Sequence, residues 1–473
     1  MNRSKMISAI DIEKILSLMA TAGEFAEVYV ETREGTSLIF DGGDLDDASG
    51  GIDSGVALRI IKDDVTYFAN SNRTDIGSIR NLAQELARDA SSPGSAVMRK
   101  AAPPLMLTLR PAQVDNVTPV KVDPLTIPIE EKVMMLKRAD AAARGYDDRI
   151  VQVTAQYIDS VREFIVASTD GTFSSDSVTI VTCAVLAIGK MGDVVRSGWE
   201  VASRASGFEI FETIKPEDVA LESARIAVQQ LTAHPAPAGT FTVVISSKAG
   251  GTMIHEACGH GLEADFIEKG VSVYAGKLGQ KVASDLISVI DDGTMLNMRG
   301  SSRYDEEGNP SKKVVLIENG ILKGFLHSGK TAKRMNVPPT GNGRRESFRH
   351  LPIPRMRNTY IAPGTMDPQE IISQVKEGIL ITDMGGGEVD TISGNFVFHC
   401  GEAYMIREGK VCEPIRDATL TGNGPEVLKK IDALGNDMGF QNGTCGKDGQ
   451  AVPVSNAQPT IRIPGIVVGG SAH

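Results

Sequence analysis

The sequence predicts an α+β protein, with an N-terminal α+β region over residues 1–236 and a mostly β C-terminal domain over residues 237–473. Helical spacings alternate with strand-like runs in the first region, whereas short β-like runs and glycine-containing turns dominate the second. The length of 473 residues also exceeds that of one ordinary hydrophobic core. The chain is therefore expected to hold two or three domains.

The first unit is expected to begin with an amphipathic helix. Its apolar residues recur with the helical period, and Gly23 is placed to end it: Ile12, Ile15, Leu16 and Met19. Residues 26–31, AEVYVE, alternate apolar and polar side chains and predict a half-buried strand. Residues 55–69 predict a hairpin that turns at Lys62-Asp63-Asp64, and the apolar spacing from Ile79 to Leu86 predicts a second helix.

The same order returns after a proline-rich segment. Residues 91–128 carry seven prolines, which favours an extended linker or a wrapping arm. A helix is then expected over residues 129–144, followed by a strand with Val151, Val153, Ala155 and Tyr157 on one face. A second strand is expected over residues 162–168, REFIVAS, before the turn TDGT. A helix followed by a hairpin, twice, suggests duplicated units.

The boundary before the C-terminal domain is expected within residues 233–239, AHPAPAG, which follow a predicted helix over residues 216–231. Residues 240–247, TFTVVISS, read as a buried strand. Two further hairpins are predicted, one turning at Asn319-Gly320 and one at Glu408-Gly409. The pattern predicts a β-rich domain in which one histidine-bearing helix is embedded.

Composition narrows the class of protein. The formal charge is −11, which argues against a general nucleic-acid or anionic-membrane partner. No apolar run approaches the roughly 20 residues that span a bilayer, and the first residues lack a signal-type pattern. The five cysteines are odd in number and widely spread, which suits a reducing compartment. We expect a cytoplasmic protein with no nucleic-acid and no membrane partner.

The segment GGTMIHEACGHGLEAD, residues 250–265, holds two histidines that could bind a metal. A catalytic zinc site uses three protein ligands and keeps one position open, and Glu256 beside His255 could polarise a bound water. His255 and His260 are five residues apart and would diverge by about 140° on a straight helix. A π-bulge or an unwound helix end would bring them together, and Gly259 and Gly261 leave the backbone free to deform.

The third ligand is open on chemical grounds. Cys258 lies three residues after His255 and could share its face, although a small buried thiol is the commoner role of a cysteine. Cys445 lies in a tight glycine-rich stretch, NGTCGKDG, with Lys447 nearby, and could present a thiolate at a fixed point. Cys400 follows His399 in a strand-like run, where core packing is favoured over ligation.

Five ordered motifs resemble one known family. They are MIHEACGHGLEADF, IENGILKGFLHS, TGNGRRESFRHLPIPRMRNTY, MGGGEVDTISGNFVF and NGTCGKDGQAVPV. Together they resemble the TldD branch of the TldD/PmbA metallopeptidases, the branch that contains HExxxH, most strongly from about residue 250 to the end.

The resemblance implies a cytoplasmic zinc peptidase in which His255, His260 and Cys445 bind Zn²⁺ and Glu256 is the general base. Cys258 is not a ligand in that pattern. The family also implies extended or unfolded peptides as substrates. As partner it implies a homologous PmbA/TldE-like subunit that lacks HExxxH; self-association as a homodimer is the other arrangement.

Two further glycine-containing segments could contribute to a site. The stretch GNGRRESFRHLP offers candidates for oxyanion stabilisation or for binding a peptide carboxylate, unless it is simply a solvated basic loop: Arg344, Arg345, Arg349 and His350. Residues 384–390, MGGGEVD, lack the Lys-Ser/Thr of a phosphate-binding loop, which argues against nucleotide binding.

A non-catalytic function is the alternative. The chain could be a regulatory or partner-binding protein, such as a gyrase modulator, that holds a structural metal. A structural zinc uses four protein ligands and needs no base, so an intact Glu256 favours a zinc-dependent peptidase.

Overall fold

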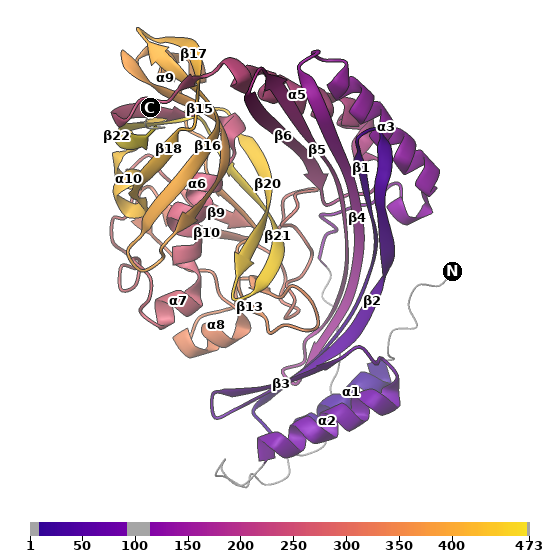
Figure 1. Cartoon of the computed structure of the whole chain (residues 1–473). Coiled ribbons are helices and arrows are strands. Elements are labelled where there is room, and N and C mark those ends of the chain that lie inside the picture. Colours follow the sequence, from indigo (N-terminus) through magenta and orange to yellow (C-terminus); the bar gives the residue numbers. More distant parts are fainter. Residues whose placement is uncertain (1–8, 92–113, 471–473) are drawn as a thin grey trace.

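A computed structural model describes residues 9–91 and 114–470 as two β-rich halves that lie side by side (Figure 1). Most of the predicted proline-rich arm, residues 92–113, lies outside the described residues. The described remainder contains η1 (Pro124–Thr126) and contacts both halves, since the carbonyl of Val122 accepts from the N–H of Phe208 and that of Val117 from Asn297. None of the described helices is both long and apolar enough to cross a bilayer.

The N-terminal half is built on one six-stranded antiparallel sheet in the order β3-β2-β1-β4-β5-β6. Its strands are β1 (Phe25–Asp41), β2 (Asp44–Lys62), β3 (Val65–Ser71), β4 (Ile150–Ser168), β5 (Phe173–Met191) and β6 (Val194–Arg204). The sheet is long and strongly curved, with α1 (Ala9–Met19) and α2 (Ile76–Ser91) at one end and α3 (Ile129–Arg144) and α5 (Pro216–Thr232) at the other (Figure 1). Each helix pair encloses its own apolar core.

The helices confirm the predicted periodicity, and the hairpin at Lys62-Asp63-Asp64 is confirmed by the pairing of Lys62 with Val65. Helix, three strands and helix occur twice in this half, and the first strands of the two units, β1 and β4, pair along their length. The predicted duplication is therefore present, and each copy holds three strands between its opening and closing helices.

One strand prediction is wrong. Residues 150–168 form the single strand β4, not two strands, because the polar residues in its middle are paired inside the protein. The carboxylate of Asp159 accepts from Lys132 at 2.6 Å, and Arg162 pairs with Glu31 at 3.0 Å. Val151 also leaves the predicted buried face, with 52% of its surface exposed, since the register shifts between Ile150 and Gln152.

The C-terminal half is mostly β, as predicted, and contains two larger sheets. The first has the order β11-β10-β9-β14-β21-β20, with β9 (Val289–Asp292), β10 (Lys313–Glu318), β11 (Ile321–Leu322), β14 (Asn358–Ile361), β20 (Gly439–Lys447) and β21 (Gln450–Gln458). The second joins β7 (His234–Pro235), β8 (Gly239–Ile245), β15 (Glu377–Val389), β16 (Asn395–Arg407), β17 (Lys410–Arg416), β18 (Thr419–Asn423) and β22 (Ile461–Gly469). Because β15 pairs with both β8 and β16, five of these strands form a closed ring.

Short elements complete this half. They are β12 (Gly343–Arg344), β13 (Ile353–Pro354), β19 (Ala433–Leu434), α7 (Ala264–Glu268), α8 (Gly329–Met335), α9 (Pro368–Ser373) and α10 (Gly424–Lys430). In the N-terminal half α4 (Ile210–Thr213) precedes α5.

Both predicted C-terminal hairpins are confirmed. Asn319 and Gly320 turn between β10 and β11 with positive φ at both residues, and Glu408 and Gly409 do the same between β16 and β17. Positive φ at both central residues matches the twist of the flanking strands. His234 and Pro235, which precede the predicted boundary at residue 236, already pair with β17 as β7. The boundary itself stays a prediction.

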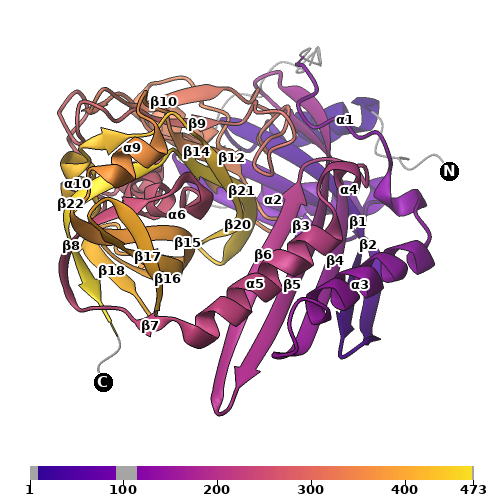
Figure 2. The ribbon, with the colours of Figure 1, turned by 90° about the horizontal axis from the view of Figure 1, so that it is seen from above.

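The two halves meet along β6 and β20. Seen from above, β6 and α5 are the elements of the N-terminal half beside β20 and β17 (Figure 2). Both β6 and β20 are terminal strands of their sheets. The junction therefore brings two unpaired strand edges to one place.

Candidate metal centre

The histidine segment changes helix type twice within eleven residues. It starts as α6 (Thr252–Ile254), continues as the π-helical turn η3 (His255–Gly259) and ends as the 3₁₀ turn η4 (His260–Leu262). In η3 the N–H of His260 donates to the carbonyl of His255, five residues back. This confirms the predicted π-bulge, and it brings the two imidazole centroids to 4.9 Å with the rings at 87°.

The two glycines on either side of His260 allow close packing. They were expected to let the backbone deform, and the structure does not use them in that way. Gly259 has ordinary helical angles, φ −53° and ψ −57°. A Cβ at Gly259 would lie 2.1 Å from Sδ of Met356, and one at Gly261 would lie 2.8 Å from the Tyr274 ring. Glycine is required here because the turn is pressed against neighbouring side chains.

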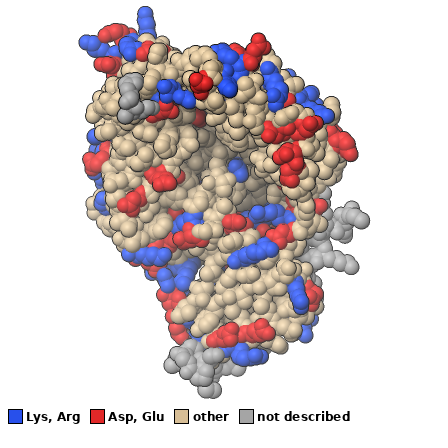
Figure 3. Space-filling model, in the orientation of Figure 1, with Lys and Arg blue, Asp and Glu red and all other residues tan. Residues whose placement is uncertain are grey.

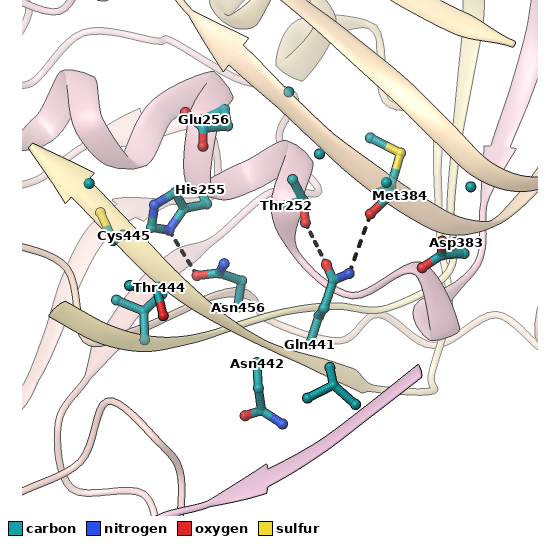
Figure 4. A pocket seen from close by; sticks show the side chains of 18 of the residues that line it. Thr252, His255, Glu256, Asp383, Met384, Gln441, Asn442, Thr444, Cys445 and Asn456 are labelled. Carbon is teal, nitrogen blue, oxygen red and sulfur yellow. Dashed lines mark hydrogen bonds between the residues drawn. The ribbon is translucent and has the colours of Figure 1, made fainter. Parts of the chain in front are cut away.

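Cys445 comes to the histidines from β20, on the opposite side (Figure 4). Its Sγ lies 3.4 Å from Nε2 of His260, and one potential ligand atom from each of His255, His260 and Cys445 lies within 4.8 Å of the others. The structure thus brings together the three residues that the resemblance implied as ligands.

Outer hydrogen bonds orient both imidazoles. Nδ1 of His255 bonds Oδ1 of Asn456 at 2.8 Å, and Nδ1 of His260 bonds Oε2 of Glu263 at 3.0 Å. When Nδ1 carries the proton in each ring, Nε2 is left as the donor atom for an ion. Burial would raise the pKa of the Cys445 thiol, but the charges and hydrogen bonds of the two histidines lower it to about 4. Two imidazole nitrogens and a thiolate fit Zn²⁺.

The other two candidate thiols do not join this group. Cys258 is fully buried and its thiol donates to the carbonyl of Ile254 at 3.5 Å, one turn back. Burial raises its pKa, which favours the neutral thiol. Cys400 lies half-buried on β16. Among the described residues, the three-residue cluster of potential ligands consists of His255, His260 and Cys445.

Glu256 lies beside the ligands without being one of them (Figure 4). Its carboxylate lines the same cavity, and within the described residues no hydrogen bond to it is formed. Burial raises the pKa of this carboxyl, against the opposing charges of His255 and His260. A carboxylate with no other partner is available to accept a proton from a molecule in the cavity.

The cavity has a volume of about 1240 Å³ and lies between the two halves. Its walls come from β6, β15, β20 and the histidine segment, and they include Trp199, Thr252, Asp383, Gln441 and Asn442. Figure 3 shows the hollow between the halves on the face of the molecule drawn there. Gln441 on β20 connects two walls, since it accepts from Thr252 and donates to the carbonyl of Met384 (Figure 4).

The arginines of GNGRRESFRHLP are placed differently from the expectation. Arg344 is buried and donates to the carbonyls of Met356 and Pro453, and Arg345 is fully buried against Glu27. Arg349 forms an exposed ion pair with Asp53, and Nδ1 of His350 bonds the hydroxyl of Ser347. These four residues are not part of the cavity wall. The predicted substrate-binding role of Arg344, Arg345 and His350 is therefore not supported, because the side chains are used in contacts of the fold.

Sequence reasoning missed Asn456 and Glu263. Glu263 follows His260 by three residues, a spacing that can bring a carboxylate to an imidazole, so a signal was present. No sequence signal pointed to Asn456, because it lies on β21 and is brought to His255 only by the tertiary fold.

Comparisons with known proteins identify the family of the chain. Three family models match in order: the PmbA/TldA metallopeptidase domain 1 at residues 26–90, the central domain at 122–231 and the C-terminal domain at 238–470. A metalloprotease TldD homolog of Buchnera aphidicola is 38% identical, over 95% of this chain and 93% of its own.

Two other comparisons point the same way. A zinc metalloprotease TldD homolog of Saccharolobus solfataricus is 32% identical over 72% of this chain and 76% of its own. A crystal structure of a candidate modulator of a DNA gyrase from Thermotoga maritima shares the fold, with a TM-score of 0.78, 23% identity and coverage of 97% of this chain and 100% of that one.

The family models span more than half of the chain, and a relative above 30% identity covers nearly all of it. The family models describe a metallopeptidase and this relative is named a metalloprotease, so both names give an enzyme that hydrolyses peptide bonds and uses a metal. The chain belongs to the TldD/PmbA family of metallopeptidases.

Proposed function

We propose that the protein is a zinc-dependent peptidase that hydrolyses bonds in extended or unfolded peptides, with Glu256 as general base. The observation that carries the proposal is the convergence of His255, His260 and Cys445 in the wall of a large cavity, next to a carboxylate that has no hydrogen-bond partner among the described residues. Mixed nitrogen and sulfur donors favour zinc over oxygen-preferring ions.

His255, His260 and Cys445 would hold the ion, which supplies Lewis acidity that polarises a carbonyl and acidifies a water. Glu256 would accept the proton of the attacking water. The same carboxyl would then deliver that proton to the nitrogen of the leaving amine, which restores the base. A raised pKa of Glu256 suits this exchange, since an acid with a very low pKa is a poor proton donor.

The cavity walls favour an extended substrate. β20 ends its sheet and carries Cys445, and β6 ends the sheet of the other half. Unpaired strand edges bind extended peptides through main-chain hydrogen bonds, which do not depend on substrate sequence.

A regulatory protein with a structural metal is less well supported. A structural zinc site uses four protein ligands, whereas the cluster among the described residues offers three. The free side of that cluster faces the cavity.

The decisive experiment combines metal analysis with peptide cleavage by the purified chain, alone and after co-expression with a homologous subunit that lacks HExxxH. Zinc near one ion per chain and cleavage of unstructured peptides are expected. Zinc without cleavage in both preparations would favour the regulatory function.

The sulfur ligand can be tested with two cysteine variants. Cys445→Ala is expected to lower zinc occupancy and melting temperature together, because the ion stabilises the state that presents its ligands together. Cys258→Ala should keep its zinc and cost about 1 kcal/mol from lost packing. Zinc analysis and thermal melts of both variants check this. Zinc retained in Cys445→Ala but lost in Cys258→Ala would contradict the assignment.

Location and assembly are further proposals. We propose a cytoplasmic protein that works as a dimer, with a homologous PmbA/TldE-like subunit or with itself. Light scattering of the purified chain is expected to give at least twice the chain mass, alone or with that subunit added. An active species of one chain mass would contradict this prediction.

A further inference from the structure

A buried carboxylate connects the two elements that carry the candidate ligands. Glu263 follows η4 and has no exposed surface. Its Oε2 accepts from Nδ1 of His260 at 3.0 Å and lies 3.0 Å from Nζ of Lys447 on β20. One oxygen atom thus joins an imidazole of the histidine segment to a cation of the facing strand.

Lys447 occupies a defined place relative to Cys445. The two residues are two apart on β20, both are buried, and Gly446 between them is exposed. Alternate residues of a strand share a face, so one face presents the thiol to His260 and the ammonium to Glu263. The ammonium also donates to Asp265 at 2.7 Å and to the carbonyl of Pro354 at 3.1 Å.

A second cation supports the same carboxylate. Arg355 is fully buried, donates through Nη2 to the carbonyl of Cys445, and places Nε 4.0 Å from Oε1 of Glu263. Glu263 is therefore held between cations from β20 and from the segment before β14.

We propose that Glu263, with Lys447 as its counter-ion, is a positioning residue that pre-forms the metal site. The carboxylate holds the proton of His260 on Nδ1, which keeps Nε2 free, and its contact with Lys447 keeps η4 against β20 so that His260 faces Cys445 before an ion binds. Outer partners of this kind change metal affinity by about 10–100-fold, because they fix the orientation and raise the basicity of the ligand. The inference rests on the proposed zinc site.

A purely structural ion pair is the competing explanation, and the chain offers a matched control for it. Asp265 also bonds Lys447, but within the described residues its carboxylate contacts neither histidine. Asp265→Asn therefore disturbs the same cation without touching a ligand. Glu263→Gln removes the charge beside His260 at nearly constant volume.

The test compares Zn²⁺ affinity, measured by chelator competition on the full-length chain, among wild type, Glu263→Gln and Asp265→Asn. Glu263→Gln is expected to weaken binding by about 10–100-fold, and Asp265→Asn to remain near wild type. The Co²⁺-substituted proteins give a second readout. Only Glu263→Gln should shift the ligand-field bands, while the thiolate charge-transfer band persists because Cys445 is intact.

Unchanged affinity in Glu263→Gln, or equal losses in both variants, would overturn the inference. If Glu263→Gln does not fold, combining it with Lys447→Met and Asp265→Asn removes the cation and both of its carboxylate partners together, which is far less costly than stranding one charge. That triple variant should fold and show the same loss of affinity, and wild-type affinity there would also overturn the inference. A wild-type chain that binds no zinc would contradict the proposed function itself, whereas wild-type binding with an unaffected Glu263→Gln contradicts this inference alone.

Discussion

Glu256→Gln is expected to retain zinc at the wild-type level and to lose peptide hydrolysis by about 10²–10⁴-fold, the usual contribution of a positioned general base. The carboxylate lies next to the ligand cluster without belonging to it, so the amide leaves His255, His260 and Cys445 in place. An amide cannot accept the proton of the attacking water. The loss should therefore appear in kcat, with a small change in KM.

Metal content and initial rates on an unstructured peptide, measured on the same preparation, check this prediction. Glu318→Gln is the matched control, because it makes the same chemical change at an exposed ion pair on β10. It should keep both zinc and activity. Turnover near wild type in Glu256→Gln would refute the base assignment, and loss of zinc there would show that Glu256 is needed to hold the ion.

The candidate ligand set was predictable because much of it is local. His255, Glu256 and His260 lie within six residues, and the helical repeat alone shows that a five-residue spacing needs a π-bulge or an unwound helix end. The partner from β20 could not be derived in this way. Chemistry left Cys258 and Cys445 open, and only the family resemblance pointed to the distant thiol. The structure shows the physical reason, since Cys258 bonds the helix backbone while Cys445 faces His260.

The failures share one physical cause, which is pairing between residues far apart in the chain. The polar centre of β4 resembles a turn in sequence, yet Asp159 is neutralised by Lys132 from α3. The two adjacent arginines of GNGRRESFRHLP resemble a solvated or anion-binding loop. Their partners, however, are distant in the sequence: Arg345 pairs with Glu27, which is 318 residues away. Sequence spacing carries no information about contacts of that range.

The second large expected effect concerns the stability of the protein and the buried ion pairs of Arg345. Arg345 has no exposed surface, pairs with Oε1 of Glu27, donates to the carbonyl of Glu306 at 3.1 Å, and places its guanidinium 4.3 Å from the Tyr29 ring centroid. Glu27 is 1% exposed and pairs through its other oxygen with Arg59, which also contacts Glu307. This ion network joins the first sheet to the C-terminal half.

Arg345→Met is expected to lower the free energy of unfolding by about 3–5 kcal/mol, because it leaves part of the charge of Glu27 buried without its partner. Unfolding entropy is about 2.1 cal/mol/K per residue, so for a chain of 473 residues this loss corresponds to a melting temperature lower by roughly 3–5 °C.

Arg349→Met, four residues along the same segment, removes an exposed ion pair with Asp53 and should cost at most about 1 kcal/mol. Adding Glu27→Gln to Arg345→Met removes the stranded charge and should recover part of the loss, which a double-mutant cycle in calorimetry would measure. Equal melting temperatures for Arg345→Met and Arg349→Met would show that the buried network does not hold the two halves together.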